Sequence, residues 1–242
     1  MISFARLARH AFYNVESRWF LPVNNFLAIV TIAATLAIIL ETVPELISYK
    51  PLFLTIEWLG VLFFTIEYIA RIAANRKDVK SYVFSFFGVV DLLSIFPSYI
   101  GLANLTYLKT ARVLRILRLL KMVRIAKLVR FEEELHTKDP DDFAHIHRLN
   151  VMIYFFALLS AMIIFGSIIY VVEEGNPDFG SIPLGILWAS KVILGGVAYN
   201  ATETVWGDIV SVGARFAGLA LFGLLISVIG SWMRKMLFGE IR

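Results

Sequence analysis

A basic residue at every third position constrains this chain more than any other feature. The series consists of Lys109, Arg112, Arg115, Arg118, Lys121, Arg124, Lys127 and Arg130, and most of the residues between these cations are aliphatic. At about 100° per residue, an α-helix winds charges with this spacing into a spiral, whereas a 3₁₀ helix stacks them in one row. A basic helix on nucleic acid or on a membrane surface needs one polar and one apolar face. Neither arrangement supplies both faces, so the pattern disfavours such a surface helix.

The composition indicates an integral membrane protein. Hydrophobic residues make up 59% of the 242 residues and charged residues only 17%, whereas soluble domains are about 45–50% apolar and about 25% charged. The absence of cysteine excludes disulfides and thiolate metal sites. We predict no enzyme activity, no metal site, no cofactor and no nucleic-acid partner. The first residues lack the pattern of a cleaved signal peptide.

Hydropathy predicts an all-α protein with six transmembrane helices. The expected spans are 24–43, 52–74, 82–100 (ending near Pro97), 109–130, 151–172 and 205–238. Residues 1–23 are expected to form an interfacial amphipathic segment anchored by Trp19, and the polar residues 131–150 a cytoplasmic linker. Basic residues gather on one side of these spans, which places both termini in the cytoplasm.

The second and third predicted spans contain three carboxylates, Glu57 and Glu67 in the second and Asp91 in the third. A carboxylate at membrane depth needs a partner or water, and the basic series offers cations without acids. The simpler interpretation is a static helical bundle held by ion pairs. A static bundle would need one acid for each cation, whereas the basic series has eight cations for these three acids. The numbers therefore favour a basic helix that moves past the acids. Moving one elementary charge across the membrane changes the free energy by ~2.3 kcal/mol per 100 mV of membrane potential. We therefore predict that residues 24–130 form a four-helix voltage-sensor domain.

Residues 151–242 have the pattern of a pore hairpin. The apolar helix at 181–194 is too short to cross a bilayer and is expected to be re-entrant, and residues 195–204 would form the constriction. The last span is rich in small residues that permit close helix packing. Among these, Gly218 and Gly223 are either gating hinges or packing positions. One hairpin cannot enclose a path for ions, so the interpretation requires an oligomer.

These features resemble the six-span voltage-gated cation channels, most closely the prokaryotic-type voltage-gated potassium channels. The motifs that carry the resemblance lie at residues 56–71, 89–97, 112–130, 164–170 and 181–189. It implies a charge-transfer centre formed by Phe64, Glu67 and Asp91, with Glu57 as the outer acid. It also implies a homotetramer in the cell membrane, in contact with lipid, that conducts monovalent cations when the 109–130 helix moves outward and pulls on the linker.

The expected selectivity filter departs from this family. The potassium-channel filter, Thr-Val-Gly-Tyr-Gly, coordinates ions through its backbone carbonyls, whereas the corresponding run here is Gly195, Gly196, Val197, Ala198, Tyr199 and Asn200. Glu203 either contributes to a ring of carboxylates in the pore or lies at the pore mouth, exposed to solvent. Lys191 either faces the ion path or snorkels away from it. K⁺ is the ion expected from the family, and a non-selective, sodium-type or anion-permeable pore is the alternative. A transporter is disfavoured because the two halves show no repeat.

Overall fold

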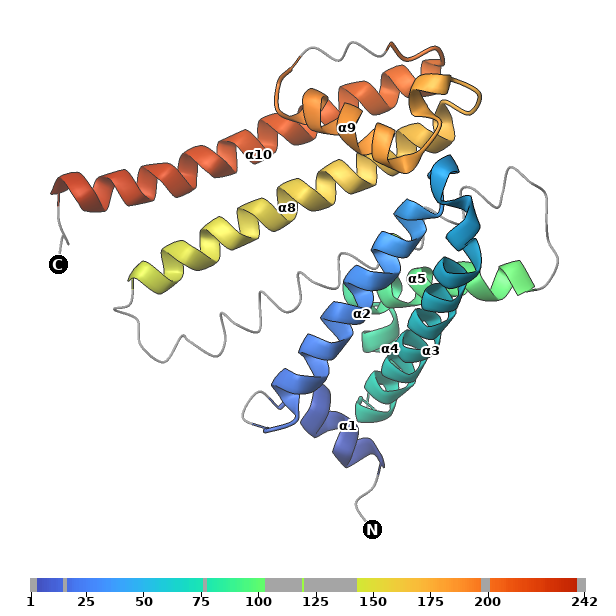
Figure 1. Cartoon of the computed structure of the whole chain (residues 1–242). Helices are drawn as coiled ribbons and strands as arrows, with labels where there is room; N and C mark the ends of the chain where they lie inside the picture. The colour runs from blue at the N-terminus through green and yellow to red at the C-terminus, as the bar shows by residue number, and fades with distance from the viewer. Residues whose placement is uncertain are drawn as a thin grey trace. The chain divides into compact units, whose positions relative to one another are not determined.

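The computed structural model describes residues 4–14, 17–75, 78–102, 119, 143–196 and 201–238. Every regular element among these residues is a helix. The chain divides into two compact units, Met1–Phe131 and Glu132–Arg242, drawn in Figure 1.

The first unit is built on a pair of long helices. Its elements begin with α1 (Phe4–Phe12), α2 (Phe20–Leu40), the 3₁₀ helix η1 (Pro44–Tyr49) and α3 (Lys50–Ala74). Helices α2 and α3 lie side by side (Figure 1) and pack along their length. A Cβ added to Gly60 of α3 would lie 3.1 Å from the Cβ of Ala34 of α2. The pair therefore approaches closely where small residues face each other.

The third expected span is interrupted. Helix α4 (Val79–Val83) ends early, and α5 (Phe86–Leu102) begins after a break. The Ser85 hydroxyl accepts a hydrogen bond from the Gly88 amide at 3.1 Å and donates one to the Tyr82 carbonyl at 2.7 Å. A serine that satisfies an amide of the first turn starts a new helix at this point. Pro97 lies inside α5, and the apolar part of that helix, Gly88–Tyr99, ends close to it, as the sequence predicts.

The second unit is a helical hairpin with a short helix packed against it. It contains α8 (Phe143–Val172), the 3₁₀ helix η3 (Pro177–Phe179), α9 (Ile182–Ile193) and α10 (Val205–Phe238). Helix α9 packs against both α8 and α10. A Cβ on Gly185 of α9 would lie 2.1 Å from the carbonyl oxygen of Gly166 of α8, so the two backbones touch there. Helix α8 begins inside the stretch expected to be a cytoplasmic linker, so residues 143–150 are helical, and their role as a linker stays a prediction.

Among the residues that the structure describes, four helical segments are long and apolar enough to cross a membrane. These segments are Phe20–Leu40, Pro44–Ala74, Asn150–Val172 and Val205–Gly230. Gly88–Tyr99 and Ile182–Ile193 are shorter apolar helices. The described residues therefore form an all-α, multi-pass membrane protein.

Candidate functional site

Three of the carboxylates that the structure describes in the first unit are buried. The exposed fractions are 4% for Glu57, 5% for Glu67 and 1% for Asp91. Glu57 and Glu67 belong to α3, which packs against the helix that carries Asp91, α5. Phe64 is fully buried and contacts side chains of α2 and α5. At helical spacing, residues 57, 64 and 67 share one face of α3, so the fold buries all four predicted residues of the charge-transfer centre in this unit.

Arg71 adds a buried cation that the sequence analysis did not assign. Its side chain is 4% exposed, and its Nε and Nη2 both lie 2.8 Å from Oε1 of Glu67. The signal in the sequence is an acid followed four residues later by arginine, a spacing that brings the two side chains together on a helix. Asp91 also has a fixed partner, because the Tyr82 hydroxyl donates to its Oδ2 at 3.0 Å.

The N-terminal helix covers Arg71. The Arg71 Cζ lies 4.8 Å from the ring centroid of Phe12 and 5.9 Å from that of Tyr13. The Asn75 side-chain amide donates to the Tyr13 hydroxyl at 2.6 Å. A cation over an aromatic face is attracted most strongly when it is desolvated. Helix α1 therefore contributes directly to the environment of the buried ion pair.

Several predicted site residues lie outside the described residues. They are the basic series Lys109, Arg112, Arg115, Arg118, Lys121, Arg124, Lys127 and Arg130, together with Val197, Ala198, Tyr199 and Asn200 of the expected filter. In the part of the chain that is described, no cluster of three His, Cys, Asp or Glu side chains is arranged to hold a metal ion.

The two glycines at the start of the expected filter cap helix α9. Gly195 has φ +79°, a left-handed conformation that favours glycine. Its amide donates to the Val192 carbonyl at 3.3 Å, and the Gly196 amide donates to the Lys191 carbonyl at 2.7 Å. This pair of bonds is a Schellman motif. Its effect is to end α9 sharply before the chain reaches residue 197.

Glu173 is a functional candidate that the sequence analysis did not identify. Its carboxylate is 1% exposed. Oε2 accepts the Glu203 amide at 2.9 Å, while Oε1 accepts the Thr204 amide at 2.9 Å and its hydroxyl at 2.7 Å. Thr204 in turn caps α10, because its hydroxyl accepts the Gly207 amide at 2.9 Å. Glu173 therefore ties the end of α8 to the start of α10, and we call this set of bonds the Glu173 clamp.

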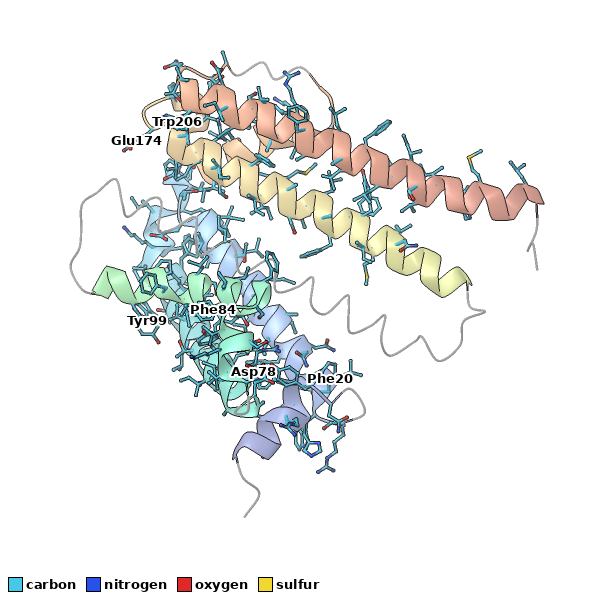
Figure 2. The ribbon with its side chains drawn as sticks, turned by 180° about the vertical axis from the view of Figure 1, so that it is seen from behind. Phe20, Asp78, Phe84, Tyr99, Glu174 and Trp206 are labelled. Atoms are coloured by element: carbon cyan, nitrogen blue, oxygen red, sulfur yellow. The ribbon has the colours of Figure 1, made fainter. Side chains whose placement is uncertain are left out.

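The surroundings of Glu173 favour its charged form. Burial alone raises the pKa of this carboxyl, but the hydrogen bonds from Glu203, Thr204 and Asn176 lower it, and the net pKa lies below the ordinary value. A Cβ on Gly207 would lie 2.0 Å from Oε1 of Glu173, so only glycine lets α10 approach this closely. Figure 2 shows the neighbouring residues Glu174 and Trp206 at the same end of the hairpin. The side chain of Glu203 itself is exposed.

A cavity of about 570 Å³ lies beside the end of α9. Its lining includes Ile193, Gly195, Arg215 and Phe222. Arg215 is an exposed cation in an apolar stretch of α10, which is the signal that the sequence analysis overlooked. A Cβ on Gly218 would lie 2.3 Å from the Ile193 carbonyl oxygen, so α10 contacts α9 through this glycine.

Gly223, the other expected hinge, has no atom within 4 Å of an added Cβ. It therefore lies in open space among the described residues, in contrast to the crowded Gly218. Hinge motion at either glycine stays a prediction.

Known proteins match the chain over most of its length. The family described as "ion transport protein" matches residues 20–242. The chain is also similar to the potassium voltage-gated channel protein Shal of Drosophila melanogaster, with 28% identity over 187 residues. That alignment covers 76% of this chain and 32% of Shal, so the chain spans about a third of this relative.

These matches agree with the motifs found in the sequence. They confirm the resemblance to voltage-gated, potassium-channel-like cation channels and the expectation of a channel rather than an enzyme. With a family match over nearly all of its residues, the chain belongs to the ion transport protein family.

Proposed function

We propose that the protein is a voltage-gated channel for monovalent cations, with K⁺ as the expected ion. The observation that carries this proposal is the burial of Glu57, Glu67 and Asp91 on neighbouring helices of a membrane protein. Ionisable groups at membrane depth are costly and mark ion pathways or voltage sensors. The chain supplies the matching cations in residues 109–130.

In this mechanism the cations of residues 109–130 move outward one after another, from an inner station formed by Glu67 and Asp91 to an outer station at Glu57. Phe64 separates these two stations with an apolar ring, so a cation is held on one side of it or on the other. Each elementary charge that crosses the membrane potential contributes ~2.3 kcal/mol per 100 mV. A few charges per subunit are enough to decide whether the pore is open.

The pore is proposed to form from four copies of the hairpin α8–α10, in a subunit of six spans with both termini in the cytoplasm of the cell. One hairpin cannot surround an ion path, and α10 exposes large apolar side chains such as Phe216, Leu219 and Phe222. Residues 131–142 would transmit movement of the sensor to α8. The contact of α10 with α9 at Gly218 would carry that movement toward the filter, with Gly218 or Gly223 as the hinge.

The assignment of K⁺ follows from the similarity to Shal, which is named as a potassium channel protein. The alternative is a pore of low selectivity, of sodium type or permeable to anions. Arg215 favours this alternative, because it places a cation in the cavity beside the end of α9. In a sodium-type pore, Glu203 would supply a ring of four carboxylates.

Neutralising part of the basic series tests the sensor. Arg118→Gln combined with Lys121→Gln removes two charges per subunit, out of about three to four gating charges in sensors of this kind. The slope of the conductance–voltage relation in planar bilayers should fall to about half, with the single-channel current unchanged. Lys80→Gln, at an exposed position of α4, is the matched control. A double variant with the slope of the unmodified protein would refute the sensor assignment.

A further inference from the structure

A cavity of about 480 Å³ lies where α1 meets the start of α2. Leu7, Ala11, Trp19 and Val23 supply an apolar lining, and the polar part of the lining consists of His10, Ser17 and Arg18. We call this cavity the elbow pocket. It belongs neither to the charge-transfer centre nor to the hairpin of the second unit.

The elbow pocket is bounded by helices that are held in place by polar contacts. Asn24, only 3% exposed, donates to the Ala11 carbonyl at 3.3 Å and to the Phe20 carbonyl at 2.7 Å. At the other side of α1, the Arg9 guanidinium donates to the Ala74 carbonyl at 3.2 Å. These bonds connect α1 to both α2 and α3. Helix α1 is therefore held in one position, and its face toward the elbow pocket stays open.

The position of the elbow pocket relative to the bilayer follows from the membrane span that begins beside it. Helix α2 is apolar enough to cross a membrane from Phe20 onward, and Figure 2 labels Phe20 at this end of the unit. Trp19 directly precedes the span, is 56% exposed, and belongs to the residue type enriched at membrane interfaces. Leu7, 57% exposed, lies in the same lining. The elbow pocket therefore lies at the level where phospholipid headgroups meet acyl chains.

We propose that the elbow pocket binds one anionic phospholipid. The Arg18 Cζ lies 5.3 Å from the ring centroid of Trp19, so the guanidinium is stacked at the pocket and offers its donor fork to a phosphate. The upper part of an acyl chain would occupy the apolar lining. A lipid with net negative charge is favoured over a zwitterionic one because the Arg18 guanidinium places a positive charge in the lining of the pocket. The proposal rests on the membrane span, not on voltage gating, so each can fail separately.

Photocrosslinking of the full-length protein in vesicles tests this site. The vesicles contain phosphatidylcholine and a small fraction of phosphatidylglycerol that carries a photoreactive group in its acyl chain. Mass spectrometry should find the label on peptides from residues 4–27. Unlabelled phosphatidylglycerol should compete for this labelling, and extra phosphatidylcholine should not.

Two variants at the elbow pocket and one control separate a site from general charge attraction. Arg18→Gln should weaken competition by phosphatidylglycerol about five-fold, the change that corresponds to ~1 kcal/mol for one basic residue at an anionic surface. Leu7→Gln should also weaken it by removing apolar lining. Lys80→Gln removes an equally exposed cation of the same unit and should change nothing.

Equal losses in Arg18→Gln and Lys80→Gln would overturn the proposal in favour of diffuse attraction to the surface. Competition that is unchanged in Arg18→Gln would overturn it as well. Arg18, Leu7 and Lys80 are all exposed, so the three variants are expected to fold. Circular dichroism spectra and melting temperatures equal to those of the unmodified protein would show that a change in labelling reflects lipid binding and not loss of the fold.

Discussion

Replacing Glu173 by glutamine should loosen the start of α10 without changing the volume of the buried side chain. In the native clamp, Oε2 accepts the Glu203 amide and Oε1 accepts both donors of Thr204. A glutamine side chain has only one acceptor oxygen, and its NH₂ group would face a backbone amide that also donates. The orientation that keeps the two Thr204 bonds leaves the Glu203 amide without an acceptor.

The expected loss can be worked out from these bonds. A hydrogen bond to a charged group contributes ~1.5–3 kcal/mol, and the bonds that survive are weaker because the charge is gone. Glu173 is 1% exposed, so little solvent screens the interaction. We expect Glu173→Gln to lower the free energy of local opening by about 2 kcal/mol. At 1.4 kcal/mol per factor of ten, amide exchange at residues 203 and 204 should become about 30-fold faster.

Hydrogen exchange with mass spectrometry measures this change on peptides that cover residues 201–208 of the reconstituted protein. Glu174→Gln is the matched control, because it removes a charge from the next residue, which is exposed. Exchange in the control should stay close to that of the unmodified protein. Peptides from the middle of α8 and α10 should exchange equally in all three proteins.

Two results would refute this reasoning. Equal exchange at residues 201–208 in Glu173→Gln and in the unmodified protein would mean that the carboxylate does not hold the start of α10. Faster exchange throughout α8 and α10 would mean that the residue supports the whole hairpin instead of one junction.

Three further predictions follow from the same structure. Because the pKa of Glu173 is lowered, the Glu173 clamp should be intact above the ordinary glutamate pKa of about 4.3 and be lost as the pH falls through the lowered pKa. The melting temperature measured against pH should show this decline, and Glu173→Gln should abolish the decline. Gly185→Ala places a Cβ 2.1 Å from the α8 backbone and should destabilise the hairpin by ~3 kcal/mol in thermal unfolding, whereas Gly223→Ala, in open space, should not. Phe12→Leu removes the aromatic ring whose centroid lies 4.8 Å from the Arg71 Cζ. A desolvated cation–π interaction contributes ~2 kcal/mol, so the substitution should speed amide exchange in residues 4–12. Unchanged exchange would contradict this contact.

The sequence predicts helices best where they cross the membrane. Long apolar runs between residues 20 and 74 and after residue 150 are conspicuous, since a bilayer requires about 20 apolar residues. The acids at 57, 67 and 91 are equally conspicuous, because a charge in such a run needs a reason. All three are buried in the fold, and the roles expected for them stay predictions.

Hydropathy fails where helix ends depend on local hydrogen bonds. Ser85 divides the third span through bonds to Tyr82 and Gly88, although the hydrophobic run continues across it. Helix α8 starts at Phe143 in a polar stretch, because hydropathy reports membrane crossing and not helix formation. Gly195 caps α9 through a bond to the Val192 carbonyl, which hydropathy does not predict, and its place in the filter stays a prediction.

The residues that sequence reasoning missed are those whose partners come from another element. Glu173 binds amides about thirty positions further along the chain, and only the folded hairpin brings them together. The cover of α1 on Arg71 has the same origin, since Phe12 and Arg71 belong to different helices. Spacing along one helix does reveal the pair of Glu67 and Arg71, and a search for acid–base pairs four residues apart would have found it.

The reversal potential of a voltage-dependent current tests the central claim most directly. The purified protein is placed in a planar bilayer with concentrated KCl on one side and a more dilute mixture of NaCl and KCl on the other, so that K⁺, Na⁺ and Cl⁻ have different equilibrium potentials, and the voltage is stepped. A voltage-gated potassium channel should give currents that switch on with voltage and reverse near the K⁺ equilibrium potential. Currents that do not depend on voltage would contradict the sensor, and reversal near the equilibrium potential of Cl⁻ in a chloride gradient would contradict a cation pore.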